Sequence, residues 1–317
     1  MWEAMLVGAR LLQFAGALVA LGASLFQGYG FRVASLQSPP MQRNRRWLRH
    51  LLLASAAAAC VGTILWIMAE TVLFSGDPRD ATRFSAVWVV FSDTRFGRVC
   101  LLRLGLLVAF IAASATMHRA RLGWVVQSIL ASLIIATFAW TGHGAMDSGL
   151  AGLIHATADI LHLWVAGVWF GALAPITILI VLALRSVDIE DTRAAYFGLE
   201  RFSAIGIAVV IALTITGLVN SWFLVGISNW RTAFASAYGQ TLFVKLGVFG
   251  LMLLLAAANR FWLTPRLGAA MNHADGQRSS SSLRALRYSL LAESSLAALL
   301  VGAVAVLGTL APPNSGE

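Results

Sequence analysis

Charged residues are scarce in this chain. They make up 12% of its 317 residues, against 59% hydrophobic residues and a mean hydropathy of +0.78. A soluble domain usually carries about 25% charged residues, so this sequence has roughly half the usual means of facing water. Long apolar runs recur along the whole sequence and leave no soluble domain of ordinary size. These observations exclude an ordinary soluble protein and favour an all-α, polytopic membrane helix bundle.

Cysteine is also rare, and nucleotide-binding motifs are missing. Cys60 and Cys100 stand alone in apolar stretches, so neither a disulfide framework nor a thiolate metal site is indicated. The G-x-x-x-x-G-K-[ST] motif is absent, and no loop is long enough for a nucleotide domain. We predict that the chain is not an enzyme and that it does not drive transport by its own ATP hydrolysis.

Eight apolar segments are long enough to cross a bilayer, which takes about 20 residues per helix. Within several residues, they lie at 8–30, 49–74, 97–117, 122–141, 152–184, 202–224, 240–262 and 288–311. The fifth is overlong and is expected to tilt or to extend past the membrane. A further apolar segment, 81–91, is too short to cross and is expected to be interfacial or re-entrant at one mouth of the bundle.

The distribution of arginine predicts how the chain sits in the membrane. Most loop arginines fall in the odd-numbered loops, whereas the even-numbered loops contain few and the loop at 142–151 has no Lys or Arg. The positive-inside rule therefore places the odd loops in the cytoplasm and both termini in the periplasm. The net charge of +9 is explained by topology, and no nucleic-acid partner is expected. Within a single transmembrane domain spanning 1–317, the Ser-rich segment 271–287 is expected to be a flexible cytoplasmic loop.

Polar side chains inside a span are costly, so each one is a candidate for function. His155, Asp159 and His162 share one face of the fifth span, because an α-helix has 3.6 residues per turn. His143 precedes them in the outer loop. Imidazole and carboxylate ligands suit a borderline metal such as Cu(II) or Zn(II). We therefore predict a metal site formed by these four residues. A hydrogen-bonded polar cluster that packs helices together is the alternative.

The spacing leaves the number of sites open. His155 and His162 are two turns apart, about 10.5 Å of rise, which is long for one ion to bridge. Asp159 is within reach of both. Either a graded pair of sites or one site completed by His143 and other helices would satisfy this spacing. Possible secondary contributors are Met146, Asp147, Met68, Glu70 and Lys245.

Other intramembrane residues favour structural roles. Lys245 could pair with Asp159 or with Glu70, although snorkelling to the interface is an equal alternative. Arg103 and Glu293 are expected to belong to structural ion pairs nearer the middle or inner side. Gly167 and Gly171 form a small-xxx-small stripe that is typical of close helix packing.

Several longer stretches resemble the copper resistance protein D family (CopD/PcoD-like). They are GHGAMDSG followed by HATADILHLWVAGVWFGALAPI, then RFSAIGIAVVIALTITGLVNSW, YGQTLFVKLGVFGLMLLLAAANRFWLTPRL, TRFGRVCLLRLGLL at 94–107, and a last span with Glu293 ending in Pro312. The likeness covers most of the chain and is strongest over 140–267. It rests on the order and spacing of these stretches together.

The resemblance implies a multi-pass protein of the bacterial inner membrane that takes part in copper homeostasis. Such a protein would bind copper ions and move them inward, often alongside a small periplasmic copper-binding protein (CopC-like). The ligands implied are His143, His155 and His162. Position 159 is Asp, where some relatives have His, so the ligand set and the copper oxidation state stay open. No copper-carrier domain is fused to the chain, so a separate protein is expected to deliver the metal.

Two other functions are compatible with the pattern. A haem b electron-transfer protein would need histidines that face each other on two helices, which the clustered outer positions suit poorly. A metal-sensing or scaffold subunit that does not transport is the other alternative.

Overall fold

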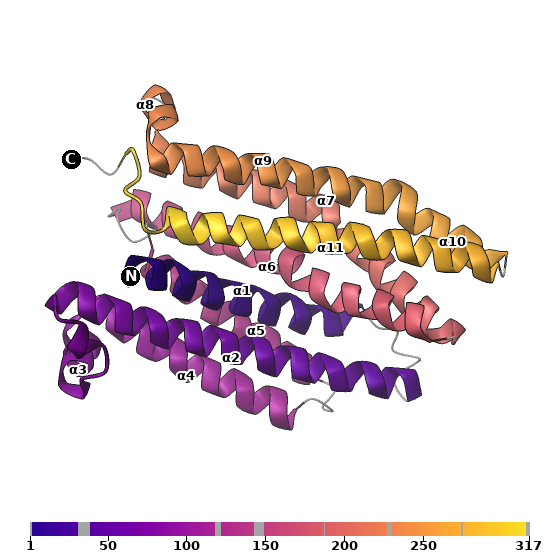
Figure 1. Cartoon of the computed structure of the whole chain (residues 1–317), viewed down its shortest axis with the longest axis horizontal. Coiled ribbons are helices and arrows are strands. Elements are labelled where there is room, and N and C mark those ends of the chain that lie inside the picture. Colours follow the sequence, from indigo (N-terminus) through magenta and orange to yellow (C-terminus); the bar gives the residue numbers. More distant parts are fainter. Residues whose placement is uncertain are drawn as a thin grey trace.

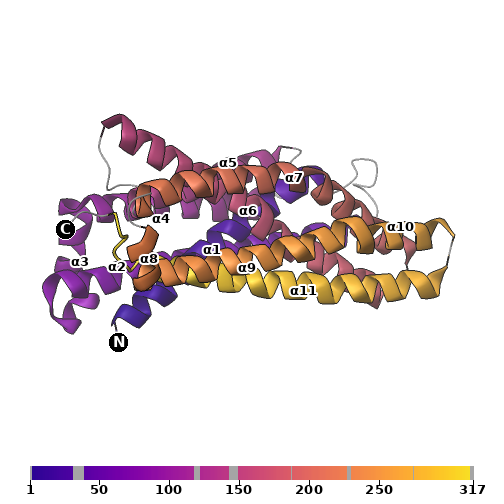
Figure 2. The same cartoon turned by 90° about the horizontal axis from the view of Figure 1, so that it is seen from above.

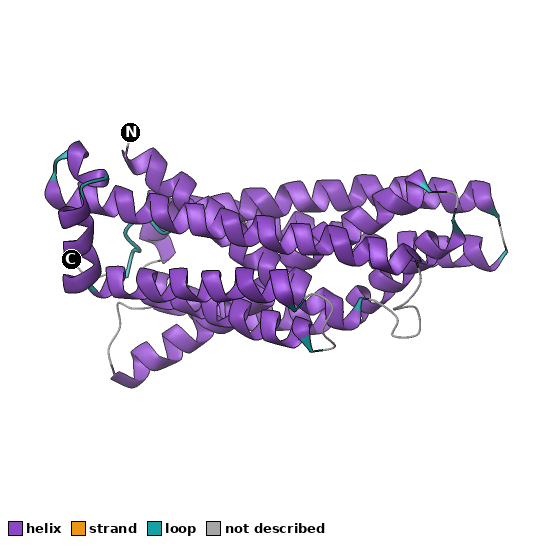
Figure 3. Ribbon diagram, turned by 90° about the horizontal axis from the view of Figure 1, so that it is seen from below, coloured by secondary structure: helices purple, strands orange, loops and turns teal. Residues whose placement is uncertain are grey.

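The computed structural model describes residues 2–30, 39–117, 122–142, 149–186, 188–226, 230–273 and 275–314. Every regular element in these ranges is helical (Figure 3). The elements are α1 (Trp2–Tyr29), α2 (Pro39–Ser75), η2 (Pro78–Ala81), α3 (Phe84–Asp93), α4 (Arg95–Thr116), α5 (Gly123–Ala136), η3 (Thr137–Trp140), α6 (Gly149–Arg185), α7 (Ile189–Val225), α8 (Trp230–Ala235), α9 (Ala237–Ala258), η5 (Asn259–Leu263), α10 (Thr264–Asn272) and α11 (Gly276–Leu307).

Eight helical segments in the described ranges are long and apolar enough to cross a membrane. Each overlaps one predicted span, so the all-α polytopic membrane bundle is confirmed. The long helices run side by side along one axis of the molecule (Figures 1 and 2). Figure 1 shows both chain ends at the same end of the bundle, beside α3 and α8. We call this the terminal end.

The opposite end is where the loop arginines gather, and we call it the arginine-rich end. It contains the start of α2, the end of α6, the start of α7, α10 and the start of α11 (Figure 1). Their arginines include Arg45, Arg185, Arg193, Arg266 and Arg278. The positive-inside rule predicts that this end faces the cytoplasm.

The fifth predicted span, α6, is overlong as expected. It has 37 residues and continues through Pro175, so it rises roughly 55 Å, against a hydrocarbon core of about 30 Å. Helices α2 and α7 also have 37 residues each. All three therefore have more length than the bilayer core needs.

Close packing of α1 on α6 organises the core. A Cβ atom on Gly22 of α1 would collide with the backbone of Gly167 and Gly171 on α6, and one on Gly171 would collide with the carbonyl oxygen of Leu18. Only glycine allows two backbones to approach this closely. The predicted small-residue stripe on the fifth span is therefore confirmed as a helix contact.

The Ser-rich segment 271–287 differs from the flexible loop that its composition predicted. Apart from a short turn between α10 and α11, its described residues are helical. The Asp275 side chain caps α11 by accepting a hydrogen bond from the Arg278 backbone N–H at 2.9 Å. Leu283 and Leu286 are buried in the core. Composition missed this because two buried leucines and one cap are enough to order a polar helix.

The short apolar segment predicted at 81–91 forms α3, which has ten residues and lies at the terminal end of the bundle (Figure 1). Its apolar side chains remain largely uncovered: Phe84 is 78% exposed, and Trp88 and Val89 are more than half exposed. It is too short to cross, as predicted, and its place at the membrane interface stays a prediction.

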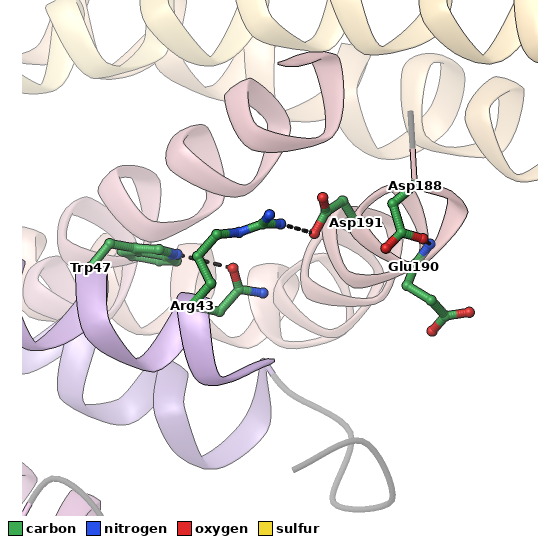
Figure 4. Close-up of polar contacts among 6 residues, drawn as sticks. Arg43, Trp47, Asp188, Glu190 and Asp191 are labelled. Atoms are coloured by element: carbon green, nitrogen blue, oxygen red, sulfur yellow. Dashed lines mark hydrogen bonds and ion pairs between the residues drawn. The ribbon is translucent and has the colours of Figure 1, made fainter. Parts of the chain in front are cut away.

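An ion pair joins α2 to α7 at the arginine-rich end (Figure 4). The Arg43 guanidinium donates to the buried Asp191 carboxylate. One turn further along α2, the Trp47 indole donates to Asn44 at 3.1 Å. Asp188 caps the start of α7 by accepting from the Glu190 backbone N–H at 2.9 Å. The ion pair therefore ties the start of α7 to the start of α2, and the Asp188 cap defines where α7 begins.

The ion pairs predicted for Arg103 and Glu293 do not form with any described residue. Arg103, which is completely buried, donates to Gln13 at 2.8 Å and to Thr137 at 2.7 Å. Glu293 accepts from neutral donors only, as set out below. Hydroxyl and amide groups on neighbouring helices can satisfy a buried charge without an opposite charge, and their position could not be read from the sequence.

Candidate functional site

Three of the predicted ligands line one pocket near the terminal end. His155, Asp159 and His162 of α6 all face a pocket of about 140 Å³. The pocket is closed by side chains of α1, α7, α9 and α11, and Lys245 of α9 is among them. The prediction that these three residues share one helix face is therefore confirmed for the part of the molecule that is described. We call this cavity the terminal pocket.

His155 is held by ring stacking. Its side chain is 2% exposed and lies parallel to the ring of Phe223 on α7, with ring centroids 4.7 Å apart and planes inclined by 4°. A stacked imidazole has little freedom to rotate, so its ring plane is set before any ligand arrives.

His162 is oriented by a hydrogen bond across to α7. Its Nδ1 lies 2.9 Å from the Thr216 hydroxyl oxygen. That hydroxyl has one hydrogen, which it donates to the Ala212 carbonyl at 2.6 Å. With the hydroxyl hydrogen placed on the Ala212 carbonyl, Nδ1 is the donor to Thr216 and Nε2 keeps its lone pair. Metal-binding histidines use the same arrangement, in which a second group fixes the tautomer.

Asp159 supplies the negative charge of the pocket. It lies between the two histidines on α6 and within electrostatic range of His155 and Lys245. Lys245 lines the pocket with it. Of the three arrangements open for Lys245, the structure favours association with Asp159. Glu70 lies elsewhere, within electrostatic range of Arg10.

The three residues do not converge on one point. Among the described residues, no group of three or more His, Cys, Asp or Glu side chains is placed to hold a single metal ion. This agrees with the two-turn separation of His155 and His162. His143, Met146 and Asp147 lie outside the described residues, so a site completed by them stays a prediction.

The secondary candidates on α2 are not part of the terminal pocket. Met68 and Glu70 are absent from its lining. The Glu70 carboxylate accepts a hydrogen bond from the Trp66 indole at 2.9 Å, one turn earlier on the same helix. Glu70 thus bonds within α2 and lies within electrostatic range of Arg10 of α1.

Three pocket residues were not among the predicted ligands. Arg10 of α1 and Tyr238 of α9 line the pocket, as does Asn220 of α7. The Asn220 Oδ1 atom is buried without a hydrogen-bond partner. A charged residue in the first apolar span was a signal that could have identified Arg10. Tyr238 gave no comparable signal, because it precedes its span in an ordinary interfacial position.

Comparison with known proteins places the chain in a family. Residues 1–153 match the model of the "Copper resistance protein D-like, N-terminal domain", and residues 198–307 match that of "Copper resistance protein D". The chain is also 32% identical to Copper resistance protein D of Pseudomonas syringae pv. tomato over 311 residues, which cover 96% of each protein. The chain belongs to the copper resistance protein D family.

Two further relatives share shorter regions with this family member. Inner membrane protein YebZ of Escherichia coli (strain K12) is 27% identical over 183 residues, which cover 57% of this chain and 59% of YebZ. Copper transport protein CutJ of Bacillus subtilis (strain 168) is 32% identical over 142 residues, which cover 44% of this chain and 25% of CutJ. No solved structure matches the chain.

The family matches do not assign the ligands of this copper resistance protein D family member. The two matched regions leave 154–197 between them, and this stretch contains His155, Asp159 and His162. The two family models thus leave most of α6 unmatched, whereas the alignment with Copper resistance protein D of Pseudomonas syringae pv. tomato covers 96% of the chain. The ligand assignment rests on the pocket alone.

Proposed function

We propose that this chain is an inner-membrane copper homeostasis protein that binds copper in the terminal pocket and imports it toward the cytoplasm. The observation that carries the proposal is the placement of His155, Asp159 and His162 in one pocket near the end opposite the arginine-rich end. Under the positive-inside rule, that pocket lies toward the periplasm. The relatives named for copper transport and for the inner membrane support copper as the cargo and the inner membrane as the location.

The donor set suits copper as cargo. Two imidazoles and one carboxylate match the preferences of Cu(II), and a neutral imidazole also accepts Cu(I). In the tautomer with the proton on Nδ1, the His162 Nε2 is available to the ion, and Asp159, which Lys245 also faces, is the anionic donor. Because the ligands are spread along two helical turns, the ion would be bound by part of the set at a time. Partial coordination allows an ion to leave as well as to enter.

Entry of a cation needs a driving force and a donor. An inside-negative membrane potential favours inward movement by about 2.3 kcal/mol per unit charge for each 100 mV. We propose that a periplasmic copper-binding protein of the CopC type delivers the ion at the terminal end. Direct transfer from this protein would supply the mostly buried pocket without a need for free copper ions in solution.

Copper binding by the purified full-length protein tests this proposal. Wild type is expected to bind copper stoichiometrically, and the double variant His155→Ala/His162→Ala is expected to lose this binding, because both imidazole donors are removed. His50→Ala is the matched control, since His50 is an exposed histidine at the arginine-rich end of α2. The control should bind as wild type does. Undiminished binding by the double variant would overturn the proposed site.

The absorption spectrum of the same sample tests the electron-transfer alternative. The two histidines lie on one helix, which disfavours bis-histidine ligation of a haem between helices. We expect no Soret band. A Soret band whose intensity corresponds to one haem per chain would contradict the copper proposal and would support haem-based electron transfer instead.

A further inference from the structure

Two further pockets lie next to the terminal pocket. The first runs beside it from the terminal end, where Gly226 and Gly239 line it, as far as Trp169, and the second lies beyond it toward the arginine-rich end. A central pocket of about 570 Å³ shares His162 and Lys245 with the terminal pocket. A distal pocket of about 250 Å³ shares Trp169 with the central one. Each pocket therefore shares at least one lining side chain with the next.

Side chains with nitrogen, oxygen or sulfur atoms recur at regular intervals along two helices that line these pockets. On α6, His155, His162 and Trp169 follow one another at intervals of seven residues. On α9 and the turn that continues it, Lys245, Met252 and Asn259 do the same. Seven residues are nearly two helical turns, about 10.5 Å of rise, so each set stays on one face. Both helices start at the terminal end, so the two sets run in the same direction (Figure 1).

The distal pocket contains a buried carboxylate without a counter-ion. Glu293 of α11 is 1% exposed. It accepts hydrogen bonds from the Trp169 indole at 2.7 Å and from the Asn259 amide at 2.9 Å. No described Lys, Arg or His lies within ion-pair distance of it, and the guanidinium of Arg260, which also lines the pocket, donates instead to Ser203. A carboxylate inside a membrane protein is costly, and such residues commonly mark ion pathways.

A second oxygen atom beside this carboxylate is unsatisfied. Asn259 is 8% exposed and lines the distal pocket, and its Oδ1 atom has no hydrogen-bond partner. Asn259 also begins the π-helical turn Asn259–Leu263 that interrupts the last part of this span. Single π-helical turns inside α-helices are frequent at functional sites. The amide nitrogen therefore fixes the carboxylate, while the amide oxygen remains available to a cation.

We propose that Glu293 and the Asn259 Oδ1 atom form a second copper-binding station, which receives the ion from the terminal pocket by way of the central pocket. This inference rests on the proposed function, and it supplies the part of the route that the terminal pocket leaves open. Oxygen donors bind copper less strongly than imidazoles do, so the second station holds the ion weakly and releases it toward the arginine-rich end.

Copper uptake by proteoliposomes containing the full chain tests the second station. Glu293→Gln removes the charge and keeps one oxygen, which can accept from either the Trp169 indole or the Asn259 amide, while its amide nitrogen takes the place of the second oxygen. We expect it to lower the initial uptake rate by about tenfold or more, which corresponds to roughly 1.4 kcal/mol at one barrier. Copper binding at the terminal pocket, measured on the same preparation in detergent, should be unchanged. Glu200→Gln is the matched control, because Glu200 is an exposed carboxylate on α7.

The outcomes separate this station from the proposed function. Uptake by Glu293→Gln at the wild-type rate overturns the station and leaves copper import intact. Absence of uptake by wild type overturns import, and the station with it. If Glu293→Gln is poorly folded, uptake by Asn259→Ala tests the second station instead. This variant removes the amide oxygen and leaves the Glu293 carboxylate in place. We then expect slowed uptake with normal binding at the terminal pocket, and unchanged uptake would contradict the station.

Discussion

Replacing Gly171 by valine is expected to prevent α1 from packing on α6 and to remove most of the folded protein. A Cβ atom at this position would collide with the Leu18 carbonyl oxygen and with the backbone of Gly22. Backbone atoms cannot rotate away as a side chain can, so the helices must separate. Overpacking of a core usually costs about 1–3 kcal/mol, and a backbone collision should exceed that range. The thermal unfolding midpoint of the purified protein, followed by fluorescence or by loss of the monodisperse peak, measures the effect.

A matched glycine provides the control for this prediction. Gly250 lies on α9, and a Cβ atom there would meet no other atom within 4 Å. Gly250→Val should therefore have an unfolding midpoint close to that of wild type. Equal midpoints for Gly171→Val and wild type would show that α1 and α6 do not approach as described.

Replacing Arg103 by methionine is expected to cause the second large loss of stability. The buried guanidinium donates to the Thr137 hydroxyl at 2.7 Å, the Thr137 carbonyl at 3.2 Å, the Thr141 hydroxyl at 2.9 Å and Gln13 at 2.8 Å. It also lies 4.2 Å from the centroid of the Phe138 ring. Methionine has similar length but no donors, so several buried acceptors on α1 and η3 would lose their partner. Because hydrogen bonds to a charged group contribute about 1.5–3 kcal/mol each, we expect a loss of at least about 3 kcal/mol.

A second arginine on α4 provides the control, because it has the same charge as Arg103 but an exposed position. Arg98 of α4 is exposed and donates to the Ser92 carbonyl at 2.9 Å. Arg98→Met should lower the unfolding midpoint little, whereas Arg103→Met should lower it strongly. Arg103→Lys is also expected to be destabilising, since an ammonium group cannot supply the forked donors that reach four acceptors. Similar midpoints for Arg98→Met and Arg103→Met would contradict this account of the network.

The membrane fold could be predicted from the sequence because its main signals are local. Each span is a run of apolar residues, and the positions of His155, Asp159 and His162 on one face follow from helical periodicity alone. The glycine contact was also foreseeable from spacing, as Gly167 and Gly171 show. The ordered helix at 271–287 was not foreseeable from composition, because it depends on packing of two leucines against distant helices.

The contacts that orient the site could not be predicted, since they join residues far apart in the sequence. The partner of His162 is Thr216, and the donors to Glu293 are Trp169 and Asn259. Nothing in the local sequence around Glu293 distinguishes a hydrogen-bonded carboxylate in a pocket from a member of an ion pair. Only the packing of α6, α9 and α11 against one another makes that distinction.

The most direct test of the central claim is the coordination of bound copper in the terminal pocket. X-ray absorption at the copper K-edge, recorded on the copper-loaded full-length protein, reports which atoms surround the metal. The account predicts imidazole scattering from His155 and His162, reduced in His162→Ala and lost or replaced in the double variant. A copper environment that is the same in wild type and in His155→Ala/His162→Ala would contradict it.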